Sequence, residues 1–84
     1  MLFKNKEELE YLFNTEYDNI LLVALRILNN NQEAEDVVQD CFIKLWENRG
    51  EISIDGSKSS YLKRMVRNRC IDIIRAQKGN LLTQ

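Results

Sequence analysis

The segment NQEAEDVVQDCFIKLWE, residues 31–47, places carboxylate, amide and aliphatic side chains on one side of an expected helix. At about 3.6 residues per turn, the members of this set fall together, opposite the apolar positions of the segment. They are Asp36, Gln39, Asp40, Ile43 and Glu47. Carboxylates around an aliphatic side chain suit the docking of a basic partner helix, because charge sets the orientation and the aliphatic group adds a water-free contact. The alternative is a solvated face with one exposed aliphatic residue.

Cationic side chains form a second set, in the segment SSYLKRMVRNRCIDIIRAQKG at residues 59–79. Helical spacing brings together Tyr61, Arg64, Arg67, Asn68, Ile71, Arg75 and Lys78. Arginine binds phosphates, an amide hydrogen-bonds base edges and an aromatic ring stacks on an unpaired base, so this composition is typical of a nucleic-acid surface. The alternative is a cationic face that serves solubility alone. Arg69 and Asp72 lie three residues apart, nearer the apolar side, and are expected to form a structural ion pair.

The sequence lacks the residue combinations that catalysis requires. It has no histidine, and we find no metal-ligand cluster, no phosphate-binding glycine loop and no nucleophile beside a base. We therefore predict that the protein is not an enzyme and has no catalytic residue, no metal site and no cofactor. Its work would be binding.

The distribution of charge favours two different partners. Residues 1–56 carry 5 basic and 12 acidic side chains, a balance of −7, whereas residues 57–84 carry 7 basic and 1 acidic, a balance of +6. One partner should tolerate acidic groups, and the other should be polyanionic. No apolar run approaches the ~20 residues that a bilayer requires, which predicts a cytoplasmic protein without a membrane partner. Cys41 and Cys70 fall at apolar helical positions and are expected to be buried free thiols.

Apolar residues recur at helical spacing from about residue 6 to about 28 and from about 31 to about 48. The first stretch is either one long helix or two short helices with a break near 14–15. Asn5 and Asn30 stand where N-terminal caps belong, because an asparagine side chain can accept a bond from a backbone N–H of the first turn. We therefore expect a sharp turn between two well-defined helices.

A third helical stretch runs from about residue 60 to about 78, with a serine at 59–60 as its N-terminal cap and Gly79 as its C-terminal cap. The polar segment at about 49–60 is a loop by composition. The expected fold is a single all-α domain over residues 1–84. It would be a small bundle of three to four helices with a loop before the last helix.

Two strings within these helices carry a resemblance to a known family. They are A-E-D-x-x-Q-D-x-F-x-x-L-W at residues 34–46 and the Y-L-x-R…N-R…D…R run at 61–75. With the opening segment LEYLFNTEYDNILLVALRIL, they closely resemble region 2 of bacterial extracytoplasmic-function (ECF) sigma factors, over roughly residues 6–79. The resemblance implies a transcription initiation factor domain that binds core RNA polymerase and recognises and melts the minus-ten promoter element.

The resemblance assigns the acidic face to the polymerase. Asp36, Gln39 and Asp40 match the family's contact positions for the clamp helices of the β′ subunit. Ile43 would be the apolar element of the same docking surface, and Glu47 would extend its acidic rim. A basic coiled coil is the partner that such a surface would meet.

The resemblance assigns the basic face to promoter DNA, including the single-stranded non-template strand. Asn68 matches an amide that faces the DNA, and Tyr61 stands where relatives usually carry tryptophan. A phenol still offers a face for stacking at the junction of paired and melted DNA, with less area. The loop at about 49–60 matches the segment that captures a base flipped from the minus-ten element, and Lys58 is expected to contact a neighbouring phosphate.

Other expectations concern the rest of the protein. The family normally carries a second helical domain, region 4, and the sequence ends before any such domain, so we expect a fragment of a two-domain protein or a truncated one. An anti-sigma factor that covers these faces is a further candidate partner. The main alternative function is a helical protein-interaction adaptor that does not bind DNA.

Overall fold

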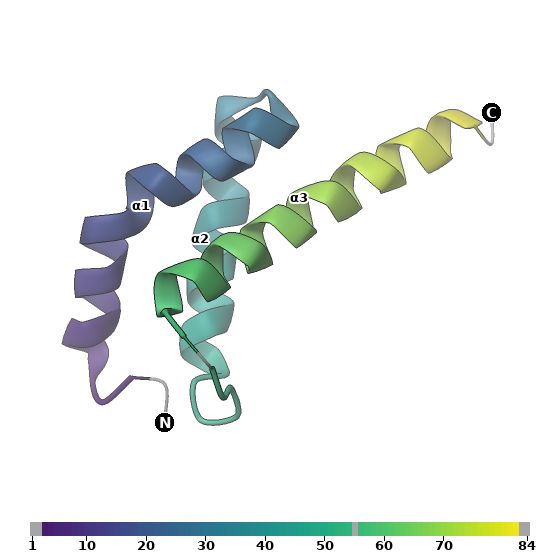
Figure 1. The fold of residues 1–84 in the computed structure, drawn as a ribbon. Helices are drawn as coiled ribbons and strands as arrows, with labels where there is room; N and C mark the ends of the chain where they lie inside the picture. The colour runs from purple at the N-terminus through teal and green to yellow at the C-terminus, as the bar shows by residue number, and fades with distance from the viewer. Residues whose placement is uncertain (1–2, 55, 83–84) are drawn as a thin grey trace.

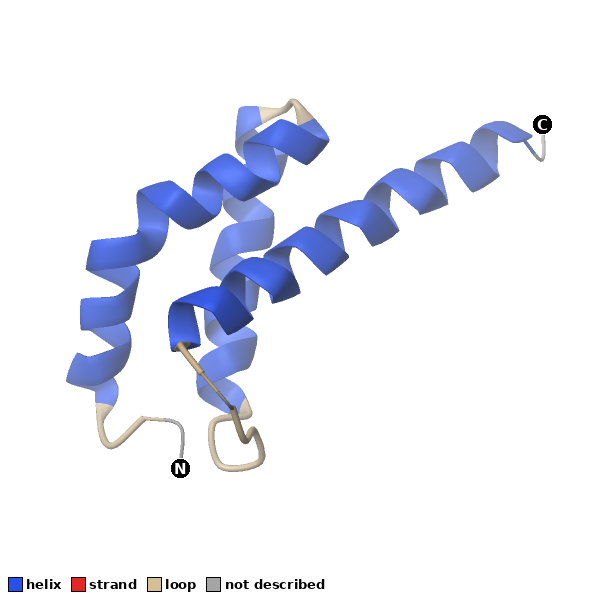
Figure 2. Cartoon of the chain, in the orientation of Figure 1, coloured by secondary structure: helices blue, strands red, loops and turns tan. Residues whose placement is uncertain are grey.

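Three α-helices make up the chain in the computed structural model, which describes residues 3–54 and 56–82, with side chains as far as Lys78. They are α1 (Lys6–Leu28), α2 (Asn31–Glu47) and α3 (Lys58–Leu82). Figure 2 shows them joined by loops, and no strand occurs in the described parts of the chain. The predicted all-α class is therefore confirmed. As far as they are described, none of these helices combines the length and the apolar content needed to cross a membrane.

Two asparagines begin the first two helices, as predicted. The Asn5 side chain accepts a hydrogen bond from the Glu8 backbone N–H (3.1 Å), and Asn30 does the same for Glu33 (2.9 Å). Each bond satisfies a backbone donor that the first turn of a helix leaves unpaired. Asn29 closes α1 with a left-handed backbone, φ 55°, which asparagine tolerates better than most residues. The chain therefore reverses direction between α1 and α2 in a very short connection.

α1 is one uninterrupted helix, although Figure 1 shows that it changes direction part-way along. The Thr15 hydroxyl, near its middle, donates to the Tyr11 carbonyl oxygen (2.8 Å). A side-chain bond to the preceding turn competes with the helical ladder and is associated with bending rather than with a break. The alternative of two separate helices with a break at 14–15 is thus wrong. The bent helix contacts both α2 and α3.

The core lies where the apolar stripes of the three helices meet. Its buried members are Leu12, Ile20, Ala24, Ala34, Val37, Val38, Cys41, Phe42, Leu45, Leu62, Val66 and Cys70 from the helices, and Phe3 from the segment before α1. Phe13 packs edge-on against Phe42 across the α1–α2 contact, with ring centroids 4.8 Å apart. No polar or charged residue is buried among those described. Apolar burial therefore holds the bundle together.

α3 begins earlier and ends later than the sequence predicts. The Ser57 hydroxyl accepts a hydrogen bond from the Ser60 backbone N–H (3.0 Å), so the predicted cap at 59–60 is wrong. The helix continues through Gly79 to Leu82, so the predicted glycine cap is wrong too. A glycine lowers helix stability by about 1 kcal/mol relative to alanine without having to end the helix. Figure 1 shows the C-terminal half of α3 extending away from the other two helices.

The predicted ion pair between Arg69 and Asp72 is wrong. Both side chains are exposed, and among the described side chains the structure records an ion pair only between Lys58 and Glu8. A spacing of three permits contact on a helix, but in water the attraction hardly exceeds the side-chain entropy that a fixed pair loses. Arg69 and Asp72 instead border a hollow on the outer side of α3.

Both cysteines are free and buried, as predicted. Burial raises the pKa of the Cys70 thiol from 9.0 to about 11, with a further contribution from Cys41. Burial also raises the pKa of the Cys41 thiol. Between about pH 9 and pH 11, the native state therefore keeps a proton on Cys70 that the unfolded chain releases.

The unfolding free energy is accordingly expected to decline at alkaline pH. The contribution of Cys70 is unchanged below about pH 9 and falls by about 2 to 3 kcal/mol by pH 11, because each pKa unit corresponds to about 1.4 kcal/mol. Urea unfolding between pH 8 and pH 11 measures this decline. Cys70→Ala is the control, because it removes this thiol alone, and it should decline less steeply. Parallel declines for the two proteins would contradict the assignment.

Candidate functional site

The outward face of α2 carries the five predicted residues in one exposed row. They are Asp36, Gln39, Asp40, Ile43 and Glu47. Ile43 leaves 55% of its surface exposed. The row turns outward because the opposite side of α2 is filled with core residues. In the described chain, only Asp36 of this row has a side-chain hydrogen bond, from Gln32 Nε2 (3.0 Å), so the other polar groups are available to a partner.

Ile43 is not an isolated aliphatic residue on this face. It borders a hollow of about 380 Å³ between α1 and α2. Beside it, the lining takes Leu9, Glu10 and Phe13 from α1 and Gln39, Phe42 and Trp46 from α2. Glu10 and Gln39 are the two polar members, and the rest are apolar. An apolar hollow beside carboxylates offers a partner helix a place for one large apolar side chain, whose burial is worth about 1.5–3 kcal/mol.

Reasoning from the sequence misses the contribution of α1 to this surface. Leu9 and Phe13 lie four residues apart on the apolar stripe of α1, which indicates core positions. In the structure each is only half-buried. A signal was available in Trp46, which falls at the edge of the α2 stripe and therefore needs an apolar neighbour outside the core.

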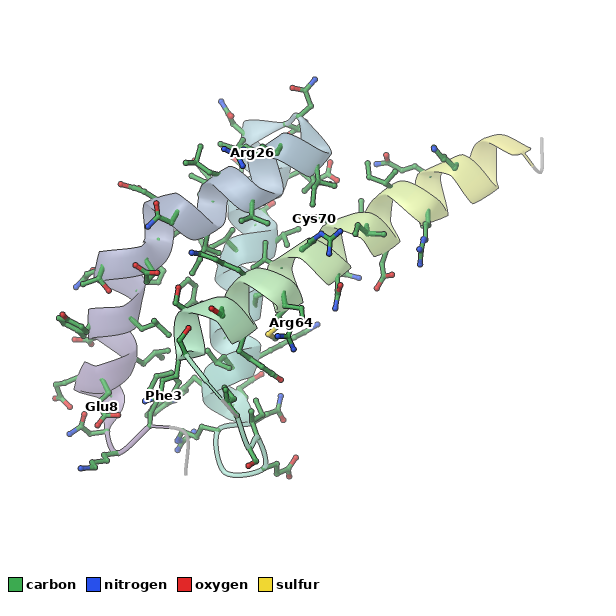
Figure 3. The ribbon with its side chains drawn as sticks, in the orientation of Figure 1. Phe3, Glu8, Arg26, Arg64 and Cys70 are labelled. Atoms are coloured by element: carbon green, nitrogen blue, oxygen red, sulfur yellow. The ribbon has the colours of Figure 1, made fainter. Side chains whose placement is uncertain are left out.

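The outward side of α3 holds the predicted cations. Exposed residues on it are Arg64, Arg67, Asn68, Arg75 and Lys78, and half-buried ones are Tyr61 and Ile71. Leu62, Val66 and Cys70 fill the opposite side of the helix with no exposed surface. Figure 3 shows nitrogen-bearing side chains continuing along α3 into the part that extends from the bundle. The charge is therefore presented along a length of helix that α1 and α2 leave open.

Tyr61 and Arg64 line two hollows on this side of α3. One, of about 250 Å³, lies between the preceding loop, residues 48–57, and the first turns of the helix. Its lining residues are Ser53, Ile54, Ser57, Ser60, Tyr61 and Arg64. The other, of about 290 Å³, continues along the helix past Asn68 to Asp72. Hydroxyls, an aromatic ring and a guanidinium around one opening can hydrogen-bond and stack a planar polar ring such as a nucleobase. The resemblance assigned the segment at about 49–60 as a whole to base capture, but it did not single out these serine and isoleucine positions, because a loop of this composition has no periodic pattern.

The loop of residues 48–57 is anchored at its start and bent near its end. The Arg49 guanidinium lies 3.8 Å from the centre of the Trp46 ring and donates to the Trp46 carbonyl oxygen (2.7 Å). Ile54 packs half-buried against the core. Gly56 has φ of 105°, a backbone conformation that residues with a side chain rarely adopt. The described parts of the loop are therefore fixed at Arg49, at Ile54 and at Gly56.

Lys58 differs from the other predicted DNA-contacting cations, because it is engaged within the molecule. Its Nζ lies 3.5 Å from Glu8 Oε2 and 4.7 Å from the centre of the Phe3 ring. The cations on the outward side of α3 have no ion-pair partner among the described side chains. A phosphate contact by Lys58 stays a prediction.

The described side chains form two candidate binding surfaces of opposite charge. Within the described residues, no three metal-ligating side chains gather in one place. An exposed acidic row lies on α2 beside an apolar hollow, and an exposed basic row lies on α3 beside two further hollows. Two faces of opposite charge on different helices can bind two partners at once.

The part of the chain that carries both faces matches one known protein family. Residues 12–79 match the family model described as sigma-70 region 2. The match includes the whole of α2, the loop after it and every basic residue described above for α3. The chain belongs to the sigma-70 region 2 family. The predicted resemblance is thereby confirmed.

This sigma-70 region 2 domain is also similar in sequence to a named sigma factor. The chain is 38% identical over 61 residues to "ECF RNA polymerase sigma factor SigW" of Bacillus subtilis (strain 168). The matched stretch covers 73% of this chain and 33% of SigW, so the chain spans about a third of the length of this relative. No solved structure matches the chain. The sigma-70 region 2 match begins at Leu12, so the first turns of α1 and the segment before them lie outside it.

Proposed function

We propose that this sigma-70 region 2 domain binds core RNA polymerase through α2 and recognises and opens the minus-ten promoter element through α3 and the loop before it. Membership of the family supports this function, as does similarity to a protein named an RNA polymerase sigma factor. The observation that carries the proposal is the separation of an acidic, apolar-centred face on α2 from a basic face with two hollows on α3. One face can hold the enzyme while the other holds DNA.

The acidic face meets the clamp helices of the β′ subunit in this proposal. Asp36, Gln39 and Asp40 bond basic and polar groups of the coiled coil, and Glu47 extends the row. Ile43 and the hollow beside it receive an apolar side chain from the same partner. Carboxylates around a desolvated apolar anchor combine orientation with affinity, as the centre and rim of a protein interface do.

The basic face meets the promoter. Phosphate contacts are assigned to Arg64, Arg67, Arg75 and Lys78, with Lys58 near the loop. Asn68 hydrogen-bonds a base edge, Tyr61 stacks at the junction of paired and melted DNA, and Ile71 adds an apolar contact. The hollow between the loop and α3 accepts a base extruded from the non-template strand. Phosphate contacts supply affinity, and base contacts supply specificity.

Opening of the promoter follows from differential binding and needs no bond-making step. Extruding a base from the stack costs a few kcal/mol. A stacking ring and a hollow that bind only the extruded form return about 1–3 kcal/mol per stacked base. Because paired DNA gains none of this, binding shifts the population toward the open form. Phosphate contacts add affinity that weakens as salt rises.

Fluorescence anisotropy with forked duplexes tests the proposal. The probes carry a random single-stranded non-template segment, and they are titrated with the chain in the presence and absence of core polymerase. We expect the complex with polymerase to prefer forked over fully paired duplexes by roughly 10-fold or more, the scale set by the cost of extruding a base. The bound pool should be enriched in one short sequence.

Two results would contradict the proposal. A chain that binds polymerase without any preference for forked DNA would support the alternative, a helical interaction adaptor. If the chain binds DNA equally well with and without polymerase and does not associate with polymerase, the proposed role of the acidic face in polymerase binding is wrong.

A further inference from the structure

The segment before α1 folds back against the base of the loop. Phe3 is only 1% exposed, and its ring centroid lies 6.3 Å from that of Trp46. Lys58 Nζ lies 4.7 Å from the centre of the same ring. Trp46 precedes the loop and Lys58 follows it, so Phe3 contacts both of its stems. Figure 3 shows Phe3 and Glu8 at the end of the molecule that holds the loop.

Two carboxylates of α1 hold the start of α3. Glu8 Oε2 accepts a hydrogen bond from the Lys4 backbone N–H (3.2 Å) and lies 3.5 Å from Lys58 Nζ. Glu16 accepts a hydrogen bond from the Ser59 hydroxyl. Lys58 and Ser59 are the first two residues of α3. The first turn of α3 is thereby tied to α1 at two points.

The turn held in this way forms one wall of the hollow between the loop and α3. Ser60, Tyr61 and Arg64 belong to this wall, and the loop supplies the other with Ser53, Ile54 and Ser57. Gly56, two residues before α3, has a positive φ of 105°. Hydrogen bonds weaken steeply with distance and angle. The position of the helical wall therefore decides which base edge the serine hydroxyls can reach.

We propose that Phe3, Glu8 and Glu16 form a brace that positions this hollow and so influences which base it accepts, without touching DNA. The inference rests on the proposed function, in which the hollow takes an extruded base. The three are positioning residues, because their effect passes through Lys58 and the rest of the first turn of α3. Phe3 and Glu8 precede residue 12, where the family match begins.

Matched substitutions separate the brace from general stability. Glu8→Gln keeps the size of the side chain and an acceptor for the Lys4 N–H, and it removes the charge that faces Lys58. Glu7→Gln is the control, because Glu7 is exposed in the same turn of α1 and has no recorded hydrogen bond or ion pair to α3 in the described chain. Phe3→Leu keeps an apolar side chain and removes the ring.

Two measurements are made on each variant. The first is the affinity of the chain with core polymerase for four forked duplexes that differ only in the base at the extruded position. The second is the amide hydrogen exchange of residues 57–61 in the chain alone. We expect Glu8→Gln and Phe3→Leu to lower the ratio of best to worst affinity about two- to five-fold, the scale of an exposed ion pair or cation–π contact. Exchange at residues 57–61 should quicken, and affinity for polymerase should stay the same.

Other results would contradict either the brace or the proposed function. The brace is wrong if Glu8→Gln matches Glu7→Gln in both measurements, or if all four duplexes lose affinity by the same factor. It is also wrong if Glu8→Gln binds all four duplexes more tightly by the same factor, since Glu8 would then only compete with the phosphate that the proposed function assigns to Lys58 and would not position the hollow. A wild-type chain that ignores the base would overturn the proposed function itself, and the recognition role of the brace with it.

Discussion

Arginine in place of Ile43 is expected to lower the affinity of the chain for core RNA polymerase by roughly 100-fold, or about 3 kcal/mol. The substitution removes the apolar group at the rim of the α1–α2 hollow and adds a cation where a basic coiled coil is proposed to dock. A cation in this contact is repelled by the basic groups of the partner, and it also loses its hydration when the contact excludes water. The fold should persist, because Ile43 is 55% exposed and does not belong to the buried core. Titration of labelled chain with core polymerase, together with thermal melting, measures both effects.

Leu22→Arg is the matched control for this experiment. Leu22 is a similarly exposed aliphatic residue, at 49%, but it lies on α1 and does not line the hollow. It should change affinity for polymerase less than about three-fold, as surface substitutions outside an interface do. Equal losses for the two variants would mean that exposed cations, not the α2 face, explain the effect. A melting shift of many degrees for Ile43→Arg would mean that the side chain supports the fold.

Glutamate in place of Arg64 is expected to lower DNA affinity by roughly 10- to 100-fold at moderate salt. The expected slope of log affinity against log salt becomes shallower by about 0.7 to 0.9 for the phosphate contact that is lost. Arg64 lines both hollows beside Tyr61, so its charge lies where single-stranded DNA is proposed to enter. Binding to core polymerase should be unchanged, since Arg64 is on a different helix from the acidic face.

Arg26→Glu provides the control, because it makes the same change in net charge at an exposed position of α1. Figure 3 shows Arg26 and Arg64 at separate places on the molecule. Titrations at several salt concentrations with both variants, and with Asn68→Ala, complete the test. Asn68→Ala should alter base preference while leaving the salt slope in place. Identical salt slopes for Arg64→Glu and Arg26→Glu would favour the alternative of a cationic solubility face.

The helices and their faces could be predicted because they depend on neighbours within one or two turns. Asp36 and Ile43 share a face through helical geometry alone, and the asparagine caps act across three residues. The ends of α3 could not be predicted in the same way. Three serines, 57, 59 and 60, offered hydroxyls to the first turn, and the chosen one depends on where the loop delivers the chain. Gly79 was compatible with an ended helix and with a continued one.

The Arg69–Asp72 prediction failed for a related reason. Spacing along a helix shows which side chains can meet, but solvent exposure decides whether meeting is favourable. In the structure both groups face water, so neither gains by pairing. Lys58, by contrast, pairs with Glu8, a residue fifty positions earlier, because α1 and the start of α3 lie together.

The sequence by itself determined the all-α class, the outward position of the acidic and basic rows, and the family, since each depends on local periodicity or on short residue strings. Only the tertiary structure decided what surrounds those rows. The hollow beside Ile43 needs Leu9 and Phe13 from α1 to meet Phe42 and Trp46 from α2. Phe3 reaches Trp46 and Lys58 only when the bundle has formed. Contacts between residues so far apart along the chain depend on how the helices pack against one another. The periodic spacing of apolar residues within each helix does not reveal this packing.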